Sequence, residues 1–499
     1  MTAKADVGAL EASGLVGIAA MEPELEYLFR HVLVQDAAYA SLLKQERREL
    51  HRRIADALVE LYPERRGELA GVIGMHLEEA GEARRAAPFL VEAGDHALSR
   101  FASREARALY DRAYDALRSE DGDPGTDRLR VRAGVGAVKA GWGSSIPTAD
   151  VDRIAGLVAV AEHLGDPRLA TEVHFWNILL RRSTGGAEAE QATRASVERL
   201  EQLGAEHGDP IAQVMPQALM GAGMVFGGQL RAGVALLEKA IPALSAGGDS
   251  LGVAVLHDVL TIAYARLGEF EAAEHNAERA DELAAQGDPI ARLDAMLARA
   301  AIASERGDLE DAVRLAGDCV ATAESLGATG CAIPANYFLG DGRLRLGEAA
   351  LARDRFARSL QIAAGDAGSA GSLTTLAQAG LASAAALLGD RAEATAGWDA
   401  SLLATRKYGD RFSEAAILFR RAAILVQGSP SDWTSILADL ETAIGLFEEM
   451  ETRPALSRAL RVYGDALTRA GRPDEGRAAI ERSRAIAAEL GLRDRPVVA

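Results

Sequence analysis

The chain has 499 residues, a formal net charge of −18, 48% apolar residues and only 5% aromatic residues. This acidic balance disfavours nucleic acid as the main partner, because phosphate binding needs clustered basic side chains. The two cysteines, Cys319 and Cys331, cannot supply a disulfide framework, and we expect both to be buried as small hydrophobes in a reducing compartment. We find neither an apolar run of membrane-spanning length nor a signal peptide, so we expect a cytoplasmic protein with no membrane partner.

The first 62 residues lack the periodicity of the rest of the chain. Residues 7–20 predict the end of a helix that runs into an apolar strand at 14–18, and a polar turn at 21–24 leads to a second strand at 27–29. The stretch 32–61 then carries apolar residues at helical spacing. A helix end, a β-ribbon and a helix are the back half of a winged-helix domain, so we interpret this block as a partial winged helix.

Beyond about residue 84, two series of helix-breaking residues alternate along the chain. One is a single glycine that recurs about every 40 residues, at Gly228, Gly268, Gly307, Gly347, Gly389, Gly428 and Gly471. The other falls roughly midway between and is mostly Gly-Asp or Gly-Asp-Pro, beginning at Gly122, Gly165, Gly208, Gly248, Gly287, Gly327, Gly365 and Gly409. We expect each glycine to end a helix in the left-handed conformation, aspartate to cap the next helix, and proline to occupy its first turn.

Two breaks in each period mean two helices in each repeat, which is the signature of a solenoid. The breaks within hairpins continue backwards through residues 185–186, 142–143 and 101–103. We therefore predict an all-α fold, a right-handed superhelix of about ten helical hairpins between about residues 84 and 490 with a small N-terminal β-ribbon. The predicted domains are 1–62, a partial winged helix with a linker helix, and 63–499, the superhelix.

The repeats resemble a known family. In the best copy, the residues at the spacing of the tetratricopeptide repeat are Leu260, Tyr264, Gly268, Phe270, Ala273 and Ala280. In that repeat a large residue on the first helix packs over small residues on the second. The period here is longer than the 34 residues of the standard motif, so the pitch of the superhelix stays open.

A second resemblance is carried by the junction between the two predicted domains. The string from Phe29 through His31 to Tyr39, with Arg47-Arg48 and Leu50-His51-Arg52-Arg53-Ile54-Ala55, resembles the segment that joins the nucleotide switch to the repeat array in bacterial signal-transduction ATPases with numerous domains (STAND). This AAA-type class includes adenylate or guanylate cyclase-associated proteins and transcriptional regulators. The resemblance implies the C-terminal part of such a protein, with an upstream nucleotide-binding domain as a partner.

The chain carries no recognisable catalytic motif. None of its five lysines stands in a Gly-x-x-x-x-Gly-Lys-Ser/Thr phosphate loop, and the histidines and cysteines lack metal-ligand spacing. We therefore expect no enzyme activity, no cofactor and no metal in this chain. The family resemblance implies that His31 is a nucleotide sensor in a full-length parent, and the alternative is a plain histidine at a helix start.

The working surface that we predict is the concave face of the superhelix, which is normally lined by the first helix of each hairpin. Aromatic, methionine and arginine side chains carry binding hot spots. The candidates on such helices are Trp142, Phe175, Trp176, Asn177, Arg181, Met220, Met224, Tyr337 and Arg343. The alternative is that most of them fill the core between helices.

Three hypotheses for the function follow. The first is a non-catalytic scaffold or sensor arm of a STAND-type or cyclase-linked regulator, which binds a protein, a peptide or a small effector. The second is part of an enzyme whose ATPase or cyclase domain lies upstream. The third is a free-standing peptide receptor built from tetratricopeptide repeats.

Overall fold

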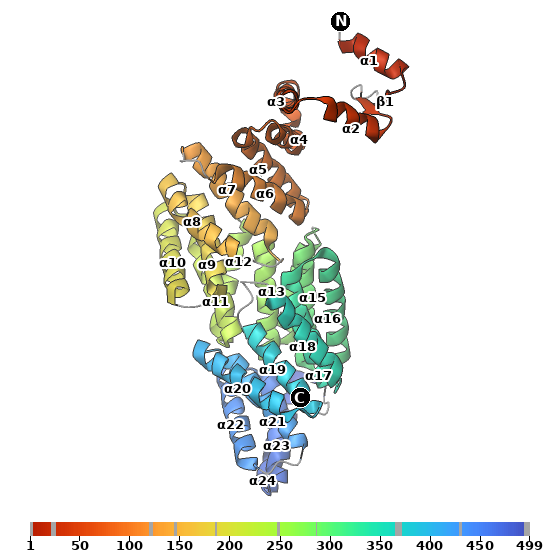
Figure 1. Ribbon diagram of the computed structural model, residues 1–499. Coiled ribbons are helices and arrows are strands. Elements are labelled where there is room, and N and C mark those ends of the chain that lie inside the picture. The colour runs from red at the N-terminus through yellow and green to blue at the C-terminus, as the bar shows by residue number, and fades with distance from the viewer. Residues whose placement is uncertain are drawn as a thin grey trace. The chain divides into compact units, whose positions relative to one another are not determined.

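The computed structural model describes residues 3–20, 26–118, 123–143, 147–184, 187–246, 250–285, 287–364, 372–428 and 432–493. Within these residues the protein consists of 24 α-helices, one 3-10 turn and one two-stranded sheet, as Figure 1 shows. The predicted all-α solenoid with an N-terminal β-ribbon is thus confirmed. The chain divides into two compact units, Met1–Ala137 and Val138–Ala499.

The first unit contains the β-ribbon and the first helices. Its two strands pair antiparallel, with Val16 opposite Phe29. The elements are α1 (Ala3–Ala12), β1 (Val16–Ala20), β2 (Glu26–Phe29), α2 (Val32–Ser41), α3 (Lys44–Leu61), a 3-10 turn (Pro63–Arg65), α4 (Arg66–Glu79), α5 (Ala83–Ser99), α6 (Ser103–Leu117) and α7 (Pro124–Gly141), whose last turn belongs to the second unit. Strand β1 begins and ends two residues later than the predicted 14–18, and β2 begins one residue before the predicted 27–29. The turn predicted at 21–24 lies outside the described residues.

The helical stretch predicted at 32–61 is interrupted. Leu42 has extended backbone with ψ 138°, and α3 restarts because the Glu46 carboxylate accepts the Leu43 N–H at 2.8 Å. A side chain that binds a free N–H at a helix start stabilises that start. Apolar spacing alone does not reveal this break, because it continues across it.

The second unit is a succession of helices. They are α8 (Thr148–Leu164), α9 (Pro167–Thr184), α10 (Ala187–His207), α11 (Pro210–Gly227), α12 (Leu230–Ala246), α13 (Ser250–Leu267), α14 (Phe270–Ala284), α15 (Pro289–Arg306), α16 (Leu309–Leu326), α17 (Thr329–Arg345), α18 (Ala349–Ala363), α19 (Ser372–Leu387), α20 (Arg391–Tyr408), α21 (Arg411–Gln427), α22 (Trp433–Glu449), α23 (Arg453–Arg469) and α24 (Pro473–Leu490). Within the second unit the helices from α9 to α24 pair as eight consecutive hairpins, and α5 pairs with α6 in the first unit.

The breaks between helices have the expected chemistry. The Asp288 carboxylate accepts the Ile290 N–H at 2.8 Å, Pro289 begins α15, and α15 ends at Gly307 with φ +87°. Gly428 departs from this pattern, because its φ of −78° and ψ of −156° are extended rather than left-handed. The breaks predicted at Gly122, Gly248, Gly365 and 185–186 lie outside the described residues.

In the α17–α18 hairpin a large buried side chain packs against small residues. Phe356 of α18 is fully buried, and a Cβ on Gly380 of α19 would lie 2.5 Å from its ring. A Cβ on Gly340 of α17 would lie 3.0 Å from the same ring. The glycines therefore let three helices meet on one aromatic ring. The low aromatic content of the chain is compatible with a dense core because alanine and glycine bring the helices close together.

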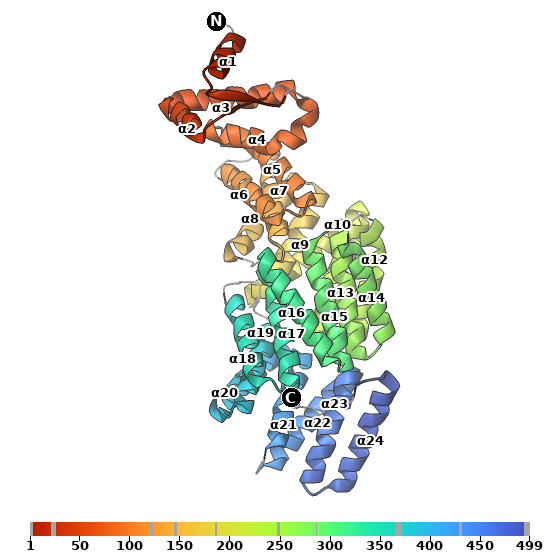
Figure 2. The same cartoon turned by 90° about the vertical axis from the view of Figure 1, so that its right-hand side faces the viewer.

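The second unit winds back onto itself after five hairpins. Helix α11 contacts α21, and α13 contacts α23 (Figure 2). At the start of the unit the Gly143 carbonyl accepts the Gly330 N–H of α17 at 2.9 Å, again five hairpins further on. These contacts fix the winding that the long repeat period leaves open. None of the described helices is long and apolar enough to cross a membrane.

Candidate functional site

A cluster of ion pairs joins helices of the second unit that are several hairpins apart. We call it the inter-turn cluster, and it contains Ser304, Glu305, Tyr337, Asp341, Arg345, Arg420 and Arg458. Arg420 of α21 donates to Asp341 of α17, and each of these side chains is only 11% exposed. Arg458 of α23 donates to Glu305 of α15 at 2.6 Å. Arg420 and Asp341 come from hairpins two apart along the array, and Arg458 and Glu305 from hairpins four apart, so both pairs tie together helices that are not neighbours in the stack.

Burial perturbs the ionisable groups of the inter-turn cluster. Burial lowers the pKa of Arg345 to about 10, and the charge of Arg458 adds to this effect. Arg345 Nη1 donates to Ser304 Oγ at 2.7 Å and lies 3.8 Å from Asp341 Oδ2. Burial likewise raises the pKa of Tyr337 to about 12. The donors and carboxylates of this cluster have protein partners, so the cluster is a structural connection between distant hairpins.

A second group of ionisable residues lies on α13, α15 and α17 and has no such pairing. Asp258 is 6% exposed, and neither of its carboxylate oxygens has a hydrogen-bond partner. Asp294 is partly exposed, and Cys331 Sγ lies 4.0 Å from its Oδ1. Burial and the charge of Asp294 raise the pKa of Asp258, and burial raises the pKa of Asp294 to about 7. We call these two residues the acid pair.

The sequence did not single out the acid pair. Asp258 lies in the mostly apolar stretch 253–264, which also contains His257 and Thr261, on the first helix of its hairpin. Asp294 stands near the start of the next such helix. A lone aspartate inside an apolar helical stretch is a usable signal, because aspartate is rarely buried without a partner.

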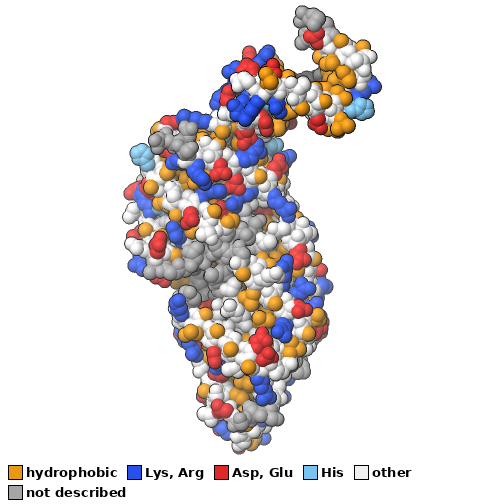
Figure 3. All heavy atoms as spheres, viewed as in Figure 1, with side chains coloured by type: hydrophobic (Ala, Val, Ile, Leu, Met, Phe, Trp, Pro, Cys, Tyr) orange, Lys and Arg blue, Asp and Glu red, His pale blue; other side chains and the backbone are white. Residues whose placement is uncertain are grey.

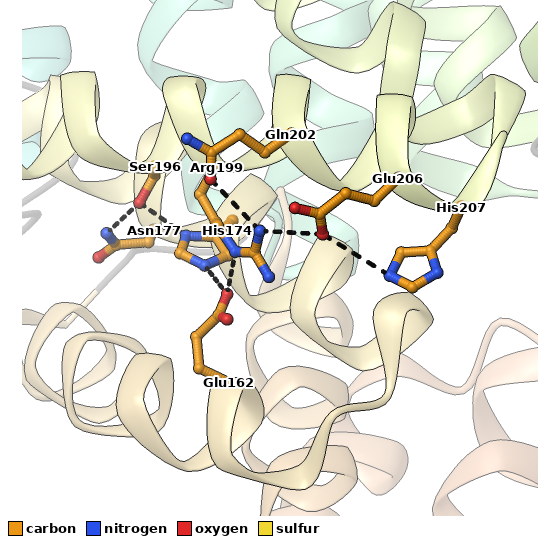
Figure 4. Close-up of polar contacts among 8 residues, drawn as sticks. All are labelled: Glu162, His174, Asn177, Ser196, Arg199, Gln202, Glu206 and His207. Atoms are coloured by element: carbon orange, nitrogen blue, oxygen red, sulfur yellow. Dashed lines mark hydrogen bonds and ion pairs between the residues drawn. The ribbon is translucent and has the colours of Figure 1, made fainter.

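Three helices share a polar network that has the order of a catalytic triad. Ser196 Oγ lies 3.0 Å from His174 Nδ1, and His174 Nε2 lies 2.9 Å from Glu162 Oε1, as Figure 4 shows. Asn177 Nδ2 also donates to Ser196 Oγ at 2.9 Å, and Arg199 Nε donates to Glu162 at 2.9 Å. The Arg199 hydrogen bond and the His174 contact lower the pKa of Glu162.

This network ties helices together instead of forming a nucleophilic site. Ser196 is 2% exposed and His174 is 4% exposed, so a substrate carbonyl has no access to the serine oxygen. A triad serine must present its oxygen to the substrate. The five side chains instead satisfy one another's hydrogen bonds between α8, α9 and α10.

The predicted groove residues divide between core and surface. Trp176 is 8% exposed, Asn177 5% and Tyr337 8%, so these three side chains pack between helices. Trp142 and Phe175 are partly exposed and meet the Trp176 ring edge-on, with centroids 5.6 and 5.2 Å away. The structure thus brings the three aromatics together in one cluster.

The other predicted residues lie on α9, α11 and α17 and at the start of α2. Arg181 is partly buried, and Arg343 Nη1 donates to Glu348 at 2.9 Å. Met220 is 48% exposed on α11, where Met224 is partly buried. His31 is exposed at the start of α2, and its side chain makes no capping hydrogen bond.

The N-terminal segment carries an unusual amount of exposed apolar surface. Figure 3 shows hydrophobic side chains gathered over α1, β1 and α2, and α2 has no buried residue at all. We define the N-terminal apolar surface as the exposed side chains of Leu10, Leu15, Ile18, Tyr27, Leu28, Phe29, Val32, Leu33, Tyr39, Leu43, Leu50, Ile54, Val59 and Leu61. Leu33 is 76% exposed and Leu43 70%. Exposed apolar residues in the second unit are scattered singly, as on ordinary surfaces.

A surface depression and the arrangement of possible metal ligands also bear on ligand binding. A depression of about 380 Å³ lies between α22, α23 and α24, but its charged residues pair with each other, as in the 2.6 Å contact of Arg482 with Glu448. Among the described residues no group of three histidine, cysteine, aspartate or glutamate side chains is placed to hold a metal ion.

Comparison with known proteins gives limited matches. No protein-family model matches the chain. A relative from Rhizobium meliloti, the uncharacterized protein R02095, is 37% identical over 93 residues, which are 18% of this chain and 9% of that protein. The match thus spans less than a tenth of a relative that is about twice as long as this chain.

Several solved structures are similar over much of the chain. The Rap conjugation regulator of plasmid pLS20 with the Phr* peptide is 12% identical, with 69% of this chain and 91% of that one covered and a TM-score of 0.47. The apo quorum sensor NprR of B. thuringiensis is 13% identical, with 72% and 97% covered and a TM-score of 0.44. The STAND protein PH0952 of Pyrococcus horikoshii is 14% identical, with 77% and 53% covered and a TM-score of 0.34. At these scores the likenesses support no functional conclusion.

Proposed function

We propose that the chain is a non-catalytic interaction module, the sensor or scaffold arm of a larger STAND-type signalling regulator. In this proposal the N-terminal apolar surface docks an upstream nucleotide-binding domain, and the repeat array binds a protein, a peptide or a small effector. The observation that supports it best is the N-terminal apolar surface itself. Contiguous apolar surface is costly to leave in water, and on stable proteins it marks an interaction site.

The family resemblance agrees with the position of this surface. The most specific part of the resemblance covers residues 29–55, and it contains Phe29, Val32, Leu33, Leu43 and Leu50 of the N-terminal apolar surface. A segment that joins a switch domain to a repeat array has to contact that domain on one side. The apolar residues of α2 and α3 are available for such a contact because nothing in the described structure covers them.

Docking is tested by one substitution on the surface and one matched control. Burying the 76% exposed Leu33 side chain at an interface would contribute about 1.5–3 kcal/mol, so Leu33→Asp should weaken docking by about tenfold or more. Leu403 of α20 is similarly exposed at 72% but lies outside the surface, so Leu403→Asp should have no effect. The assay is biolayer interferometry against the nucleotide-binding region encoded upstream in the gene. Equal loss with both variants, or binding that neither changes, would contradict the proposal.

The second hypothesis, part of an enzyme with an upstream catalytic domain, uses the same docking surface. The two differ in what the docked protein does. Reading the gene ahead of Met1 for a phosphate loop or a cyclase domain distinguishes them, and so does measuring ATP or GTP turnover by the docked assembly. Turnover by this chain alone would contradict a non-catalytic arm.

A further inference from the structure

The acid pair lies on the first helices of consecutive hairpins, which are the helices that line the inner face of a solenoid. Helix α13 carries Asp258, α15 carries Asp294, and the two helices pack directly against each other. The two carboxyl groups are close enough for their charges to interact, yet no hydrogen bond joins them. The Asp258 oxygens are therefore left free to accept a hydrogen bond from a donor.

The charges that surround the acid pair do not neutralise it. Among the facing groups, Asp281 of α14 is already engaged by Arg299 of α15 through an ion pair, and Asp288 caps the start of α15. Cys331 of α17 contributes only a thiol, and the nearby Cys319 of α16 donates its thiol to a backbone carbonyl. The acid pair is thus surrounded by further carboxylates and neutral groups.

An unpaired buried carboxyl group is costly, so its presence calls for an explanation. A buried carboxylate without a partner loses its hydration and shifts its pKa upward until it is neutral. Here Asp258 is more than nine-tenths buried with both oxygens unsatisfied, while Asp294 is partly exposed beside it. Asp294 is therefore the group that a ligand can reach, and Asp258 lies behind it. Such strain is typically retained where a ligand relieves it.

We propose that the acid pair binds a primary ammonium group of a ligand on the inner face of the array, with Asp294 as the contacting residue and Asp258 as a positioning residue behind it. An ammonium group is compact and brings three donors, which suits two carboxyl groups on adjacent helices. A divalent metal ion prefers six or more oxygen ligands, and the described residues hold no group of three candidate ligands. A peptide amino terminus, a lysine side chain and a polyamine all supply the required group.

The proposal deepens the proposed function, because it rests on the array having a ligand, and its outcome is independent of docking at the N-terminal apolar surface. Binding of a cation stabilises the ionised form of both carboxyl groups. Burial raises the pKa of Asp258 and raises that of Asp294 to about 7, so a bound cation should displace protons from the acid pair. A ligand that bound elsewhere would leave the protonation of the acid pair unchanged.

The test is isothermal titration calorimetry of the full chain at pH 7 in two buffers with different ionisation enthalpies. The probes are spermidine for the polyamine, Nα-acetyl-lysine amide for the lysine side chain, and trialanine amide for the peptide amino terminus. Each has a fully N-acetylated counterpart, triacetylspermidine in the case of the polyamine, that lacks every ammonium group. We expect at least one probe to bind with release of about one proton, and its acetylated form not to bind.

Substitutions then locate the site. Asp294→Asn should abolish binding, and Asp258→Asn should weaken it about tenfold and reduce proton release, because the second charge behind the contact is lost. The control is Asp311→Asn, an exposed aspartate of α16 that is 61% exposed and pairs with Arg314. Circular dichroism confirms that each variant is folded. The proposal is overturned if no probe binds at about 10 mM, if an acetylated probe binds equally well, or if Asp294→Asn binds as tightly as the unchanged chain.

Discussion

The inter-turn cluster makes a quantitative prediction about what holds the superhelix closed. Asp341 of α17 is 11% exposed, and it is the carboxylate partner of Arg420 from α21 and lies 3.8 Å from Arg345. Asp341→Ala removes this carboxylate, so the guanidinium groups of Arg420 and Arg345 stay buried without it. Breaking a buried pair from one side costs about 3–5 kcal/mol, because the remaining charge has no compensation. We expect a loss of that size in the free energy of unfolding, measured by urea unfolding followed by circular dichroism.

Two further variants separate the buried pair from surface electrostatics. Asp311→Ala removes the carboxylate of an exposed pair on α16, in which the two side chains are 59% and 61% exposed, and it should leave the urea midpoint unchanged. The double variant Asp341→Leu with Arg420→Met replaces the charges by apolar groups and should recover part of the loss. Small-angle scattering should show that Asp341→Ala is less compact. If Asp341→Ala loses no more stability than Asp311→Ala, the inter-turn cluster does not hold the turns together.

Three other outcomes are expected. Phe356→Ala should cost about 3–5 kcal/mol in urea unfolding, because the fully buried ring fills the space over Gly380, and a smaller loss would contradict this packing. Burial and the neighbouring His51 lower the pKa of His76, so the unfolded chain takes up a proton at higher pH than the folded chain does. The first unit should therefore lose stability as the pH falls from 7 to 5, and His76→Gln should show less of that loss in thermal melting. Burial raises the pKa of Asp258, so the folded chain loses stability progressively as the pH rises above the ordinary range for aspartate. Asp258→Asn should therefore raise the melting temperature more at pH 8 than at pH 5.

The secondary structure was largely predictable because its breaks are local chemistry. Glycine with positive φ at Gly268 and Gly307, and the cap formed by Asp288, follow from backbone sterics and hydrogen bonding within a few residues. The break between α2 and α3 was missed because the apolar spacing continues across it while a capping contact to Glu46 restarts the helix. The winding was not predictable, because contacts such as α13 with α23 depend on angles accumulated over five hairpins.

The candidate site was less predictable than the fold. Aromatic residues such as Trp176 and Tyr337 can fill a core or face a partner, and composition does not distinguish these roles. The acid pair depends on which helix faces meet, so Asp258 and Asp294 become neighbours only after the hairpins stack. The apolar spacing in 32–61 predicts an ordinary amphipathic helix with one buried face. In the structure α2 has no buried residue, so neither of its faces is covered.

The most direct test of the proposed interaction arm is hydrogen exchange of α2 and α3 in the full chain, measured alone and together with the nucleotide-binding domain that the proposed function places upstream. Leu33 of α2 and Leu43, just before α3, carry exposed side chains of the N-terminal apolar surface. Docking should slow their exchange while leaving that of α20, with its exposed Leu403, unchanged. Unchanged exchange across residues 32–61 would contradict the assignment of this surface as the docking site.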